Sequence, residues 1–253
     1  MFDASAIKAS FGRAADDYDA NAHLQRVVRQ HCLQLVKPLL PKMSRVLDAG
    51  CGTGALFTEA AGLGWRMFGF DLSGGMCTHA ARKNHPVINA DAAQMPIASE
   101  SIDGIISSLM LQWANDPEAV LAEMQRVLTP GGYVMLSTLA EGTLIELKQS
   151  FAAIDNAAHV SEFEPAHRLL ALAENVGLSL VSARQTAIVE YYPDTVALMQ
   201  ALKSIGAGNK RTNRRRGLMT SRQFARLEQE YQKFSTPQGL PATWQALYLV
   251  LRK

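Results

Sequence analysis

Apolar residues along the first 140 positions alternate between short runs typical of buried strands and longer stretches with helical spacing. We expect strands over residues 45–48, 66–71, 87–91, 103–111 and 133–138. We expect helices over residues 21–36, 54–63, 74–84 and 117–128, and a turn over 129–132. Pro38 and Pro41 end the first helix, whereas Pro117 opens the last. This repetition of strand and helix predicts an α/β fold with a doubly wound, mostly parallel sheet.

The alternation changes after residue 140. Further helices are expected near 143–156, 166–175, 194–205 and 220–234, with strands over 178–192 and 243–251. The added strands bring the expected sheet to seven strands. No linker rich in Pro, Gly or Ser separates the later helices from the rest of the chain. We therefore expect one domain over residues 1–253, with a helical cap inserted at about 193–235.

The composition is that of a globular chain of 253 residues, of which 48% are hydrophobic and 19% are charged. No apolar stretch is long enough to span a membrane, and the first residues carry neither a basic leader nor an apolar run. We therefore expect a cytoplasmic protein without a membrane partner. Cys32, Cys51 and Cys77 show no disulfide or metal-ligand spacing, so no metal is expected. The net charge of +2 hides a local excess, because residues 203–216 hold six basic residues and no acid.

A glycine-rich loop follows the first predicted strand. Its sequence, DAGCGTG over residues 48–54, lets bare backbone approach a ligand at the carboxyl edge of the sheet, where doubly wound folds bind their ligands. The G-x-G-x-x-A spacing that starts at Gly50 also satisfies the dinucleotide fingerprint, and Asp71 lies where that fingerprint places its ribose-binding acid. The loop alone therefore does not decide between a dinucleotide and another nucleoside-bearing ligand.

Three acids at the ends of successive predicted strands favour S-adenosylmethionine. Asp48 would repel a pyrophosphate but would attract the ammonium group of an amino-acid-bearing ligand. S-adenosylmethionine has that ammonium group and no phosphate. Asp71 can accept hydrogen bonds from both ribose hydroxyls. Asp91, with Ala92 and Ala93 beside it, suits an adenine whose exocyclic amine donates to a carboxylate.

In these residues the chain resembles the class I S-adenosylmethionine-dependent methyltransferases. Residues 48–54, Asp71, Asp91 and the turn over 130–132 match that family's successive motifs in order, within about residues 44–140. The resemblance implies a Rossmann-like fold, S-adenosyl-L-methionine as cofactor and S-adenosyl-L-homocysteine as product. The cofactor-binding residues that it implies are Asp48, Gly50, Cys51, Gly52, Gly54, Asp71, Leu72, Met76, Asp91, Ala92, Ala93 and Leu109.

The chain shows no motif typical of a general base or a nucleophile around its histidines, cysteines or aspartates. Methyl transfer from a sulfonium is an in-line displacement, which mainly needs alignment of the acceptor and exclusion of water. A carboxylate acceptor, with a reference pKa near ~4, is already ionised at neutral pH and requires no base. The sequence therefore fits an acid as the methyl acceptor, with no catalytic side chain expected, but does not prove it.

Four segments spread over nearly the whole chain are similar to the malonyl-acyl-carrier-protein O-methyltransferases of biotin synthesis. They are FGRAADDYDANAHLQR (11–26), SLMLQW (108–113), TLAEGTLIELKQSF (138–151) and LMQALKSIGAGN (198–209). This resemblance implies methylation of the free carboxylate of a malonyl group on acyl carrier protein, so that fatty-acid synthesis elongates it into the pimeloyl precursor of biotin. It also implies an N-terminal helical lid over residues 1–40 and a cofactor-binding core over 44–140.

The same resemblance points to residues for the acceptor. Tyr18 would line the methyl-transfer pocket, and Gln112 and Trp113 would face the acceptor after the fourth strand. Acyl carrier proteins are strongly acidic, so the basic stretch would steer their docking or pair with the malonyl carboxylate. The basic residues assigned to this role are Lys203, Lys210, Arg211 and Arg214.

Three other functions stay open from the residues alone. A small-molecule methyltransferase would need a base or a larger apolar pocket, and nothing after residue 140 excludes the pocket. An RNA methyltransferase would use the basic stretch, but the pI is only about 8.4 and the chain lacks a separate RNA-binding module, so no nucleic-acid partner is expected. A sensor or scaffold that binds S-adenosylmethionine without turnover would carry the same glycines and acids.

Overall fold

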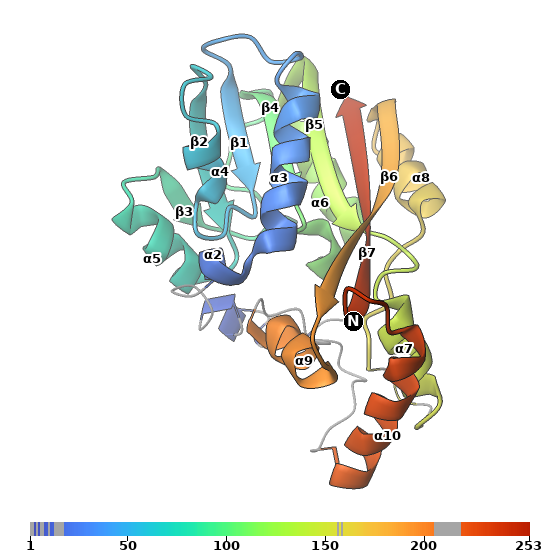
Figure 1. The fold of residues 1–253 in the computed structure, drawn as a ribbon. Coiled ribbons are helices and arrows are strands. Elements are labelled where there is room, and N and C mark those ends of the chain that lie inside the picture. Colours follow the sequence, from blue (N-terminus) through green and yellow to red (C-terminus); the bar gives the residue numbers. More distant parts are fainter. Residues whose placement is uncertain are drawn as a thin grey trace.

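Seven strands form a single sheet in the order β3-β2-β1-β4-β5-β7-β6 (Figure 1). The computed structural model describes residues 3, 5, 8–9, 11–12, 18–155, 157, 159–204 and 219–253. β7 runs antiparallel to both of its neighbours, and the other pairs of strands are parallel. The predicted doubly wound, mostly parallel sheet is therefore confirmed. The strands are β1 (Arg45–Ala49), β2 (Arg66–Asp71), β3 (Val87–Asn89), β4 (Ile102–Ser108), β5 (Leu128–Leu139), β6 (Ser179–Tyr192) and β7 (Leu240–Arg252).

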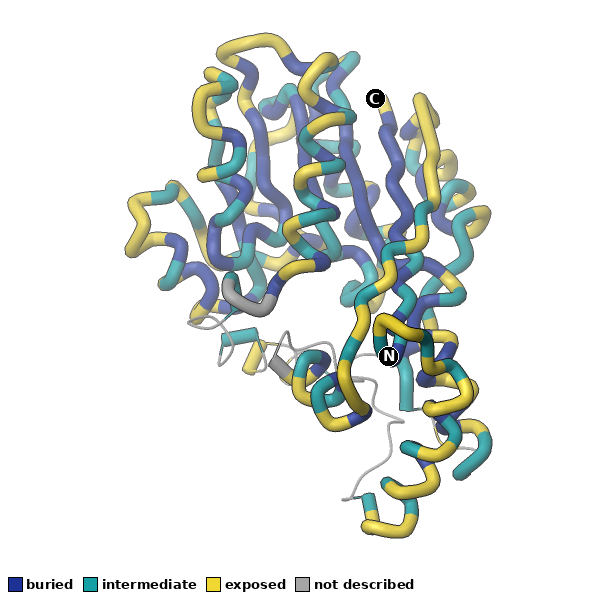
Figure 2. The backbone as a smooth tube through the Cα atoms, in the orientation of Figure 1, coloured by how far each residue is buried: buried dark blue, intermediate teal, exposed yellow. Residues whose placement is uncertain are grey.

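Helices cover both faces of the sheet. α3 (His23–Val36) lies on the face turned toward the viewer in Figure 1, and α6 (Pro117–Val127) and α8 (Ala166–Asn175) pack on the opposite face. Neighbouring residues of one strand serve different faces, because Ile106 packs in the cluster with α3 and Ile105 packs in the cluster with α6 and α8. Figure 2 shows the burial of the central strands that results. Strands buried on both faces explain the continuous apolar runs of the sequence.

Several predicted elements are longer than the observed ones. The helix predicted over 54–63 is α4 (Ala55–Glu59), which gives way to turns before Gly62. The strand predicted over 103–111 is β4, which ends at Ser108 because the next residue, Leu109, adopts a left-handed φ of 53°. The chain then enters a short 3-10 helix, η1 (Leu111–Trp113). This break after β4 is what brings the residues of η1 over the carboxyl edge of the sheet.

The turn predicted over 129–132 is wrong as stated, because these residues lie inside β5. The pairing between β4 and β5 jumps from Ile102 opposite Leu128 to Gly104 opposite Tyr133, so residues 129–132 bulge out of the ladder. Gly131 has a φ of 81°, and its N–H donates to the carbonyl of Lys253 at 3.1 Å. Glycine permits the bulge, and pairing with the last residues of the chain keeps it within the sheet.

The predicted cap lies between β6 and β7. Its described helices, α9 (Thr195–Ser204) and α10 (Ser221–Tyr231), lie below the carboxyl ends of the parallel strands, where α10 packs against α7 (Ile145–Ala152) (Figure 1). Apolar residues of all three helices join the cluster that contains α3. The division of the chain into 1–40, 44–140 and 193–235 stays a prediction. Within the described ranges, no helix is long and apolar enough to cross a membrane.

Candidate active site

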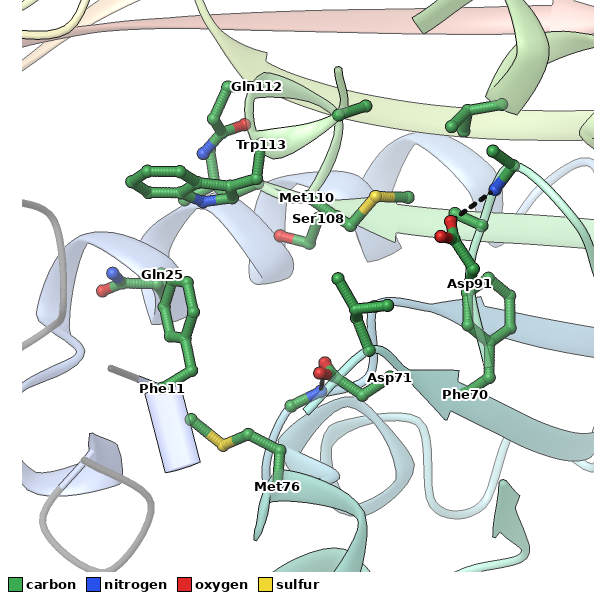
Figure 3. A pocket seen from close by; sticks show the side chains of 18 of the residues that line it. Phe11, Gln25, Phe70, Asp71, Met76, Asp91, Ser108, Met110, Gln112 and Trp113 are labelled. Atoms are coloured by element: carbon green, nitrogen blue, oxygen red, sulfur yellow. Dashed lines mark hydrogen bonds between the residues drawn. The ribbon is translucent and has the colours of Figure 1, made fainter. Parts of the chain in front are cut away.

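A pocket of about 270 Å³ opens at the carboxyl ends of β1, β2 and β4 (Figure 3). The strand order reverses between β1 and β4, and ligands of doubly wound sheets bind at such a switch point. The walls come from the glycine loop after β1, the ends of β2 and β4, the turn after β3, η1 and the N-terminal segment. Elements far apart in sequence therefore meet around one cavity.

The glycine loop presents bare backbone to this pocket. Gly50, Gly52 and Gly54 have φ values of 79°, 53° and 80°, a region that other residues rarely adopt. The N–H groups of Gly50 and Cys51 both donate to the carbonyl of Phe70 at 2.9 Å, which ties the loop to β2. Gly50 and Gly52 line the pocket, whereas Gly54 begins α4 behind the loop. These hydrogen bonds and left-handed backbone angles fix the shape of the loop.

Asp71 stands at the end of β2 and faces the pocket (Figure 3). Its Oδ2 accepts the N–H of Gly52 at 2.9 Å and its Oδ1 accepts the N–H of Ser73 at 2.8 Å. Burial raises the pKa of this carboxyl, and the two N–H donors oppose that rise. Each oxygen can accept more than one hydrogen bond, so the carboxylate can still receive a pair of hydroxyl groups from a ligand. This is the chemistry that a ribose diol requires.

A second acid lies across the pocket from the first (Figure 3). β3 ends two residues before Asp91, so this carboxylate stands in the turn after the strand and not on the strand end that the sequence predicts. The N–H of Ala93 donates to its Oδ1 at 2.9 Å. Ala92, Ala93, Leu72, Met76 and Leu109 line the same pocket with apolar atoms. An acid beside an apolar slot suits a flat base whose edge donates hydrogen bonds.

Two of the predicted cofactor residues besides Gly54 do not line the pocket. Asp48 is 3% exposed, and within the described structure its Oδ2 has no hydrogen-bond partner. Cys51 is buried against Gly69 of β2. Burial raises the pKa of Asp48 to about 8, with Asp71 and Glu59 adding to the rise and Arg29 opposing it. A direct role of these residues in binding the cofactor stays a prediction.

The raised pKa of Asp48 predicts a stability that falls as the pH rises. The folded chain keeps a proton on Asp48 up to about pH 8, whereas the unfolded chain releases it near the ordinary value of 3.8. The folded state therefore binds more protons between these two values, and the free energy of unfolding decreases with increasing pH across that window. In Asp48→Asn, which mimics the protonated form, we expect a smaller loss between about pH 5 and about pH 8 in denaturant titrations. Equal losses in the two proteins would contradict this account.

The other end of the pocket, here called the acceptor end, is lined by Tyr18, Gln25, Ser108, Gln112 and Trp113. Burial raises the pKa of the Tyr18 hydroxyl to about 12, so it is a protonated hydrogen-bond donor at neutral pH. The hydroxyl of Thr138 donates to Oε1 of Gln112 at 3.1 Å, which fixes the orientation of that side chain. These residues hold neutral polar groups and no histidine, cysteine or carboxylate.

Aromatic rings close the acceptor end. Phe11 makes an edge-to-face contact with Tyr18, at a centroid distance of 6.3 Å. It makes a second one with Trp113, at 5.6 Å (Figure 3). Trp244 of β7 lines the pocket from deeper in the core and is 1% exposed. The structure therefore brings Tyr18, Gln112 and Trp113 together around one pocket, as the sequence predicts.

The predicted basic residues lie elsewhere or are not described. Lys203 is exposed on α9 and does not line the pocket. Lys210, Arg211 and Arg214 lie outside the described residues. No lysine or arginine is found among the described residues that line the pocket.

Sequence reasoning missed several lining residues, among them Phe11, Gln25, Ser108 and Trp244. Phe11, Gln25 and Ser108 lie inside the segments whose resemblance is noted above, so those segments carried the signal. Trp244 belongs to the apolar alternation of the last strand, where the sequence gives no reason to separate a pocket wall from the core.

Comparison with known proteins identifies the family. A family model described as "Methyltransferase domain" matches residues 47–136, which include the glycine loop, Asp71 and Asp91. The malonyl-[acyl-carrier protein] O-methyltransferase of Laribacter hongkongensis is 37% identical, over 97% of this chain and 88% of that protein. The protein of the same name from Yersinia pestis is 34% identical, over 98% of this chain and 91% of its own length. The biotin biosynthesis bifunctional protein BioHC of Teredinibacter turnerae is 36% identical, over 98% of this chain but only 46% of its own length.

Solved structures agree on the fold. The YcgJ protein of Bacillus subtilis has a TM-score of 0.63 at 16% identity, covering 88% of this chain and 98% of that one. A SAM-dependent methyltransferase from Archaeoglobus fulgidus has a TM-score of 0.54 at 17% identity, covering 90% and 94%. The sheet order, the pocket at its switch point and the near full-length relatives lead to one conclusion: this chain is an S-adenosylmethionine-dependent methyltransferase that belongs to the malonyl-[acyl-carrier protein] O-methyltransferase family.

Proposed function

We propose that this chain methylates the free carboxylate of a malonyl group carried by acyl carrier protein, which yields the malonyl methyl ester that primes pimeloyl synthesis for biotin. The observation that carries the proposal is one continuous pocket. Carboxylates that can accept hydrogen bonds from a ligand line one end of it, and neutral hydrogen-bond donors line the other. The family membership supports the choice of substrate. Malonyl carriers are intermediates of cytoplasmic fatty-acid synthesis, so we place the enzyme in the cytoplasm.

The end of the pocket lined by Gly50, Gly52, Asp71 and Asp91, here called the donor end, fits S-adenosylmethionine. When bound, this cofactor supplies an electrophilic methyl group on a sulfonium. We assign Asp71 to the ribose hydroxyls and Asp91 to the exocyclic amine of the adenine. Gly50 and Gly52 would let the backbone approach the methionine part, where any side chain would reduce the space. Leu72, Met76, Ala92, Ala93 and Leu109 would form the apolar walls around the base.

The acceptor end suits a group that is already ionised. A carboxylate needs no base, and the described residues of the acceptor end include no histidine, cysteine or carboxylate that could serve as one. Neutral donors such as the Tyr18 hydroxyl and the Gln112 amide can orient one carboxylate oxygen and leave a lone pair on the other free to attack. A bidentate arginine would bind more strongly but would also hold the attacking oxygen. The ring of Phe11 over Tyr18 and Trp113 would keep water away from the reacting groups.

The carrier protein is the proposed macromolecular partner. Lys203 is exposed on α9. This helix lies below the carboxyl ends of the parallel strands (Figure 1). With Lys210, Arg211 and Arg214 it would give an acidic partner a positive surface that raises the encounter rate. Exposed charges of this kind are screened by salt, so docking is expected to weaken as the ionic strength rises.

The proposal is tested by measuring the release of S-adenosylhomocysteine with malonyl-carrier protein, with acetyl-carrier protein and without an acceptor. We expect turnover with the malonyl carrier alone, because the acetyl group has no carboxylate. Added salt should slow the reaction of the carrier protein more than that of malonyl-coenzyme A, which has no protein surface to dock. If S-adenosylhomocysteine is released equally slowly in all three reactions although S-adenosylmethionine binds, the proposal is wrong. The chain would then bind S-adenosylmethionine without transferring its methyl group.

A further inference from the structure

The N-terminal segment is fastened to the donor-binding loop through one carboxylate. Oδ1 of Asp19 accepts the hydroxyl of Thr53 at 2.6 Å, and Oδ2 accepts Nζ of Lys83 at 3.0 Å. Lys83 also donates to the backbone carbonyl of Thr53 at 3.2 Å. The side chains of Asp19 and Lys83 are 43% and 36% exposed, whereas Thr53 is buried. We call these three residues the Asp19 clasp.

The far end of the clasp is part of the glycine loop. Thr53 stands between Gly52, whose N–H donates to Asp71, and Gly54, which begins α4. The clasp therefore links α2 (Tyr18–Asn21) directly to the loop that shapes the donor end of the pocket.

Other contacts of the described N-terminal residues reach the same donor elements. Ser73, which caps α5 (Gly74–Arg82), donates from its hydroxyl to the carbonyl of Lys8 at 3.3 Å. Gly12 and Gly75 pack so closely that a Cβ on Gly75 would lie 2.9 Å from the Cα of Gly12. Ser73 and Gly75 follow Asp71 directly, so these contacts also attach the segment to the donor end.

The near end of the clasp is next to the acceptor end. Asp19 follows Tyr18 in α2, and Tyr18 lines the pocket in edge-to-face contact with Phe11. Arg26 of α3 donates to the backbone carbonyl of Asp19 at 3.2 Å and so restrains the same turn from its other side. With the carboxylate held by Thr53 and Lys83, the backbone that carries Tyr18 is fixed relative to the glycine loop.

We propose that Asp19 is a positioning residue. By binding Thr53 and Lys83, it holds the Tyr18 hydroxyl at the acceptor end in a fixed position relative to the glycine loop. The proposal rests on the proposed function for its kinetic consequences. Alignment of acceptor and donor dominates an in-line displacement, and misplacement by about an ångström can cost up to about a hundredfold in rate. Asp19 itself does not line the pocket, so it acts through its neighbour.

The experiment compares Asp19→Ala, Tyr18→Phe and the double variant. We expect Asp19→Ala to lower kcat by about tenfold, while the Kd for S-adenosylmethionine changes by less than about threefold, since Asp71 and Asp91 remain. In the Tyr18→Phe background, Asp19→Ala should lower kcat little further, because the group that it positions is gone. Asp19→Asn, which keeps an acceptor for Thr53, should retain part of the activity. Fully multiplicative losses in the double variant would overturn the proposal.

Asp103→Asn is the matched control. Asp103 forms a comparably exposed ion pair with Arg45, at 2.7 Å, but at the opposite end of the sheet from the pocket. Its kcat should equal that of the wild type. Amide hydrogen exchange tests the Asp19 clasp independently of the reaction. Residues 18–26 should exchange faster in Asp19→Ala than in the wild type and in Asp103→Asn. This result is expected even if the wild type methylates no malonyl carrier. Unchanged exchange over those residues would overturn the positioning role, whereas an inactive wild type would overturn only the proposed function.

Discussion

Asp71→Asn is expected to raise the Kd for S-adenosylmethionine by at least about tenfold, on the scale of a lost hydrogen bond to a charged group. The amide keeps the shape of the side chain, but its NH₂ group cannot accept the N–H of Gly52 or Ser73 that the carboxylate accepts now. The variant therefore loses an acceptor for the ligand and disturbs the glycine loop at the same time. Isothermal titration calorimetry with S-adenosylmethionine or S-adenosylhomocysteine measures the change.

The matched control for this prediction is Asp194→Asn. Asp194 also accepts a backbone N–H, from Ala197 at 2.7 Å, but it does so at the start of α9 and does not line the pocket. Its substitution should leave the Kd for S-adenosylmethionine unchanged. An unchanged Kd in Asp71→Asn as well would remove Asp71 from the donor site.

Gly50→Ala is expected to abolish measurable binding of S-adenosylmethionine. A Cβ at this position would lie 2.5 Å from Cγ and 2.7 Å from Cβ of Met110, and the φ of 79° is strained for any residue with a side chain. Met110 lines the pocket, so either the loop or the wall that faces it has to move. Binding is measured by calorimetry, and the free energy of unfolding by denaturant titration.

Gly62→Ala separates backbone strain from the clash. Gly62 has a similar φ of 87°, but a Cβ there meets no atom within 4 Å, and the residue does not line the pocket. This variant should lose about 1 kcal/mol of stability, as a left-handed position does when glycine is replaced, and should bind S-adenosylmethionine normally. Normal binding in Gly50→Ala would show that the close approach of this glycine to the opposite wall is not needed for the ligand.

Much of the fold follows from local signals in the sequence. β2 has the predicted bounds, and α8 does too, because apolar spacing and a proline before α8 mark them without help from the rest of the chain. The bulge over 129–132 depends on the pairing of β5 with both β4 and the end of β7, which no local pattern contains. The end of β4 depends on the left-handed backbone of Leu109, a residue type that gives no warning of it.

The residues of the site also divide into those that local sequence patterns predict and those that they do not. Gly50, Gly52, Asp71 and Asp91 line the pocket because each lies at or just after the carboxyl end of a parallel strand, and these ends share one edge of the sheet. Asp48 lies inside β1, one residue before the strand ends, and is buried there, although the sequence predicts it at the strand end. Phe11 and Trp244 reach the pocket from the two ends of the chain, so only the tertiary structure brings them to it.

The expected pairing of a basic residue with the malonyl carboxylate stays a prediction, since Lys210, Arg211 and Arg214 lie outside the described residues. The described residues of the acceptor end offer a tyrosine hydroxyl, two amides and a serine. These neutral groups fit a nucleophile whose charge must stay available, whereas the exposed Lys203 fits the docking of an acidic partner. Binding of the carrier and binding of the reacting group are thereby assigned to different surfaces.

The central claim, transfer of a methyl group to the malonyl carboxylate, is tested most directly by the intact mass of the carrier protein. Malonyl-acyl carrier protein is incubated with the enzyme and S-adenosylmethionine, with acetyl-acyl carrier protein as the control that lacks a free carboxylate. The account predicts a gain of one methyl group on the malonyl carrier and none on the acetyl carrier. No gain on the malonyl carrier, with S-adenosylmethionine bound tightly in calorimetry, would contradict it.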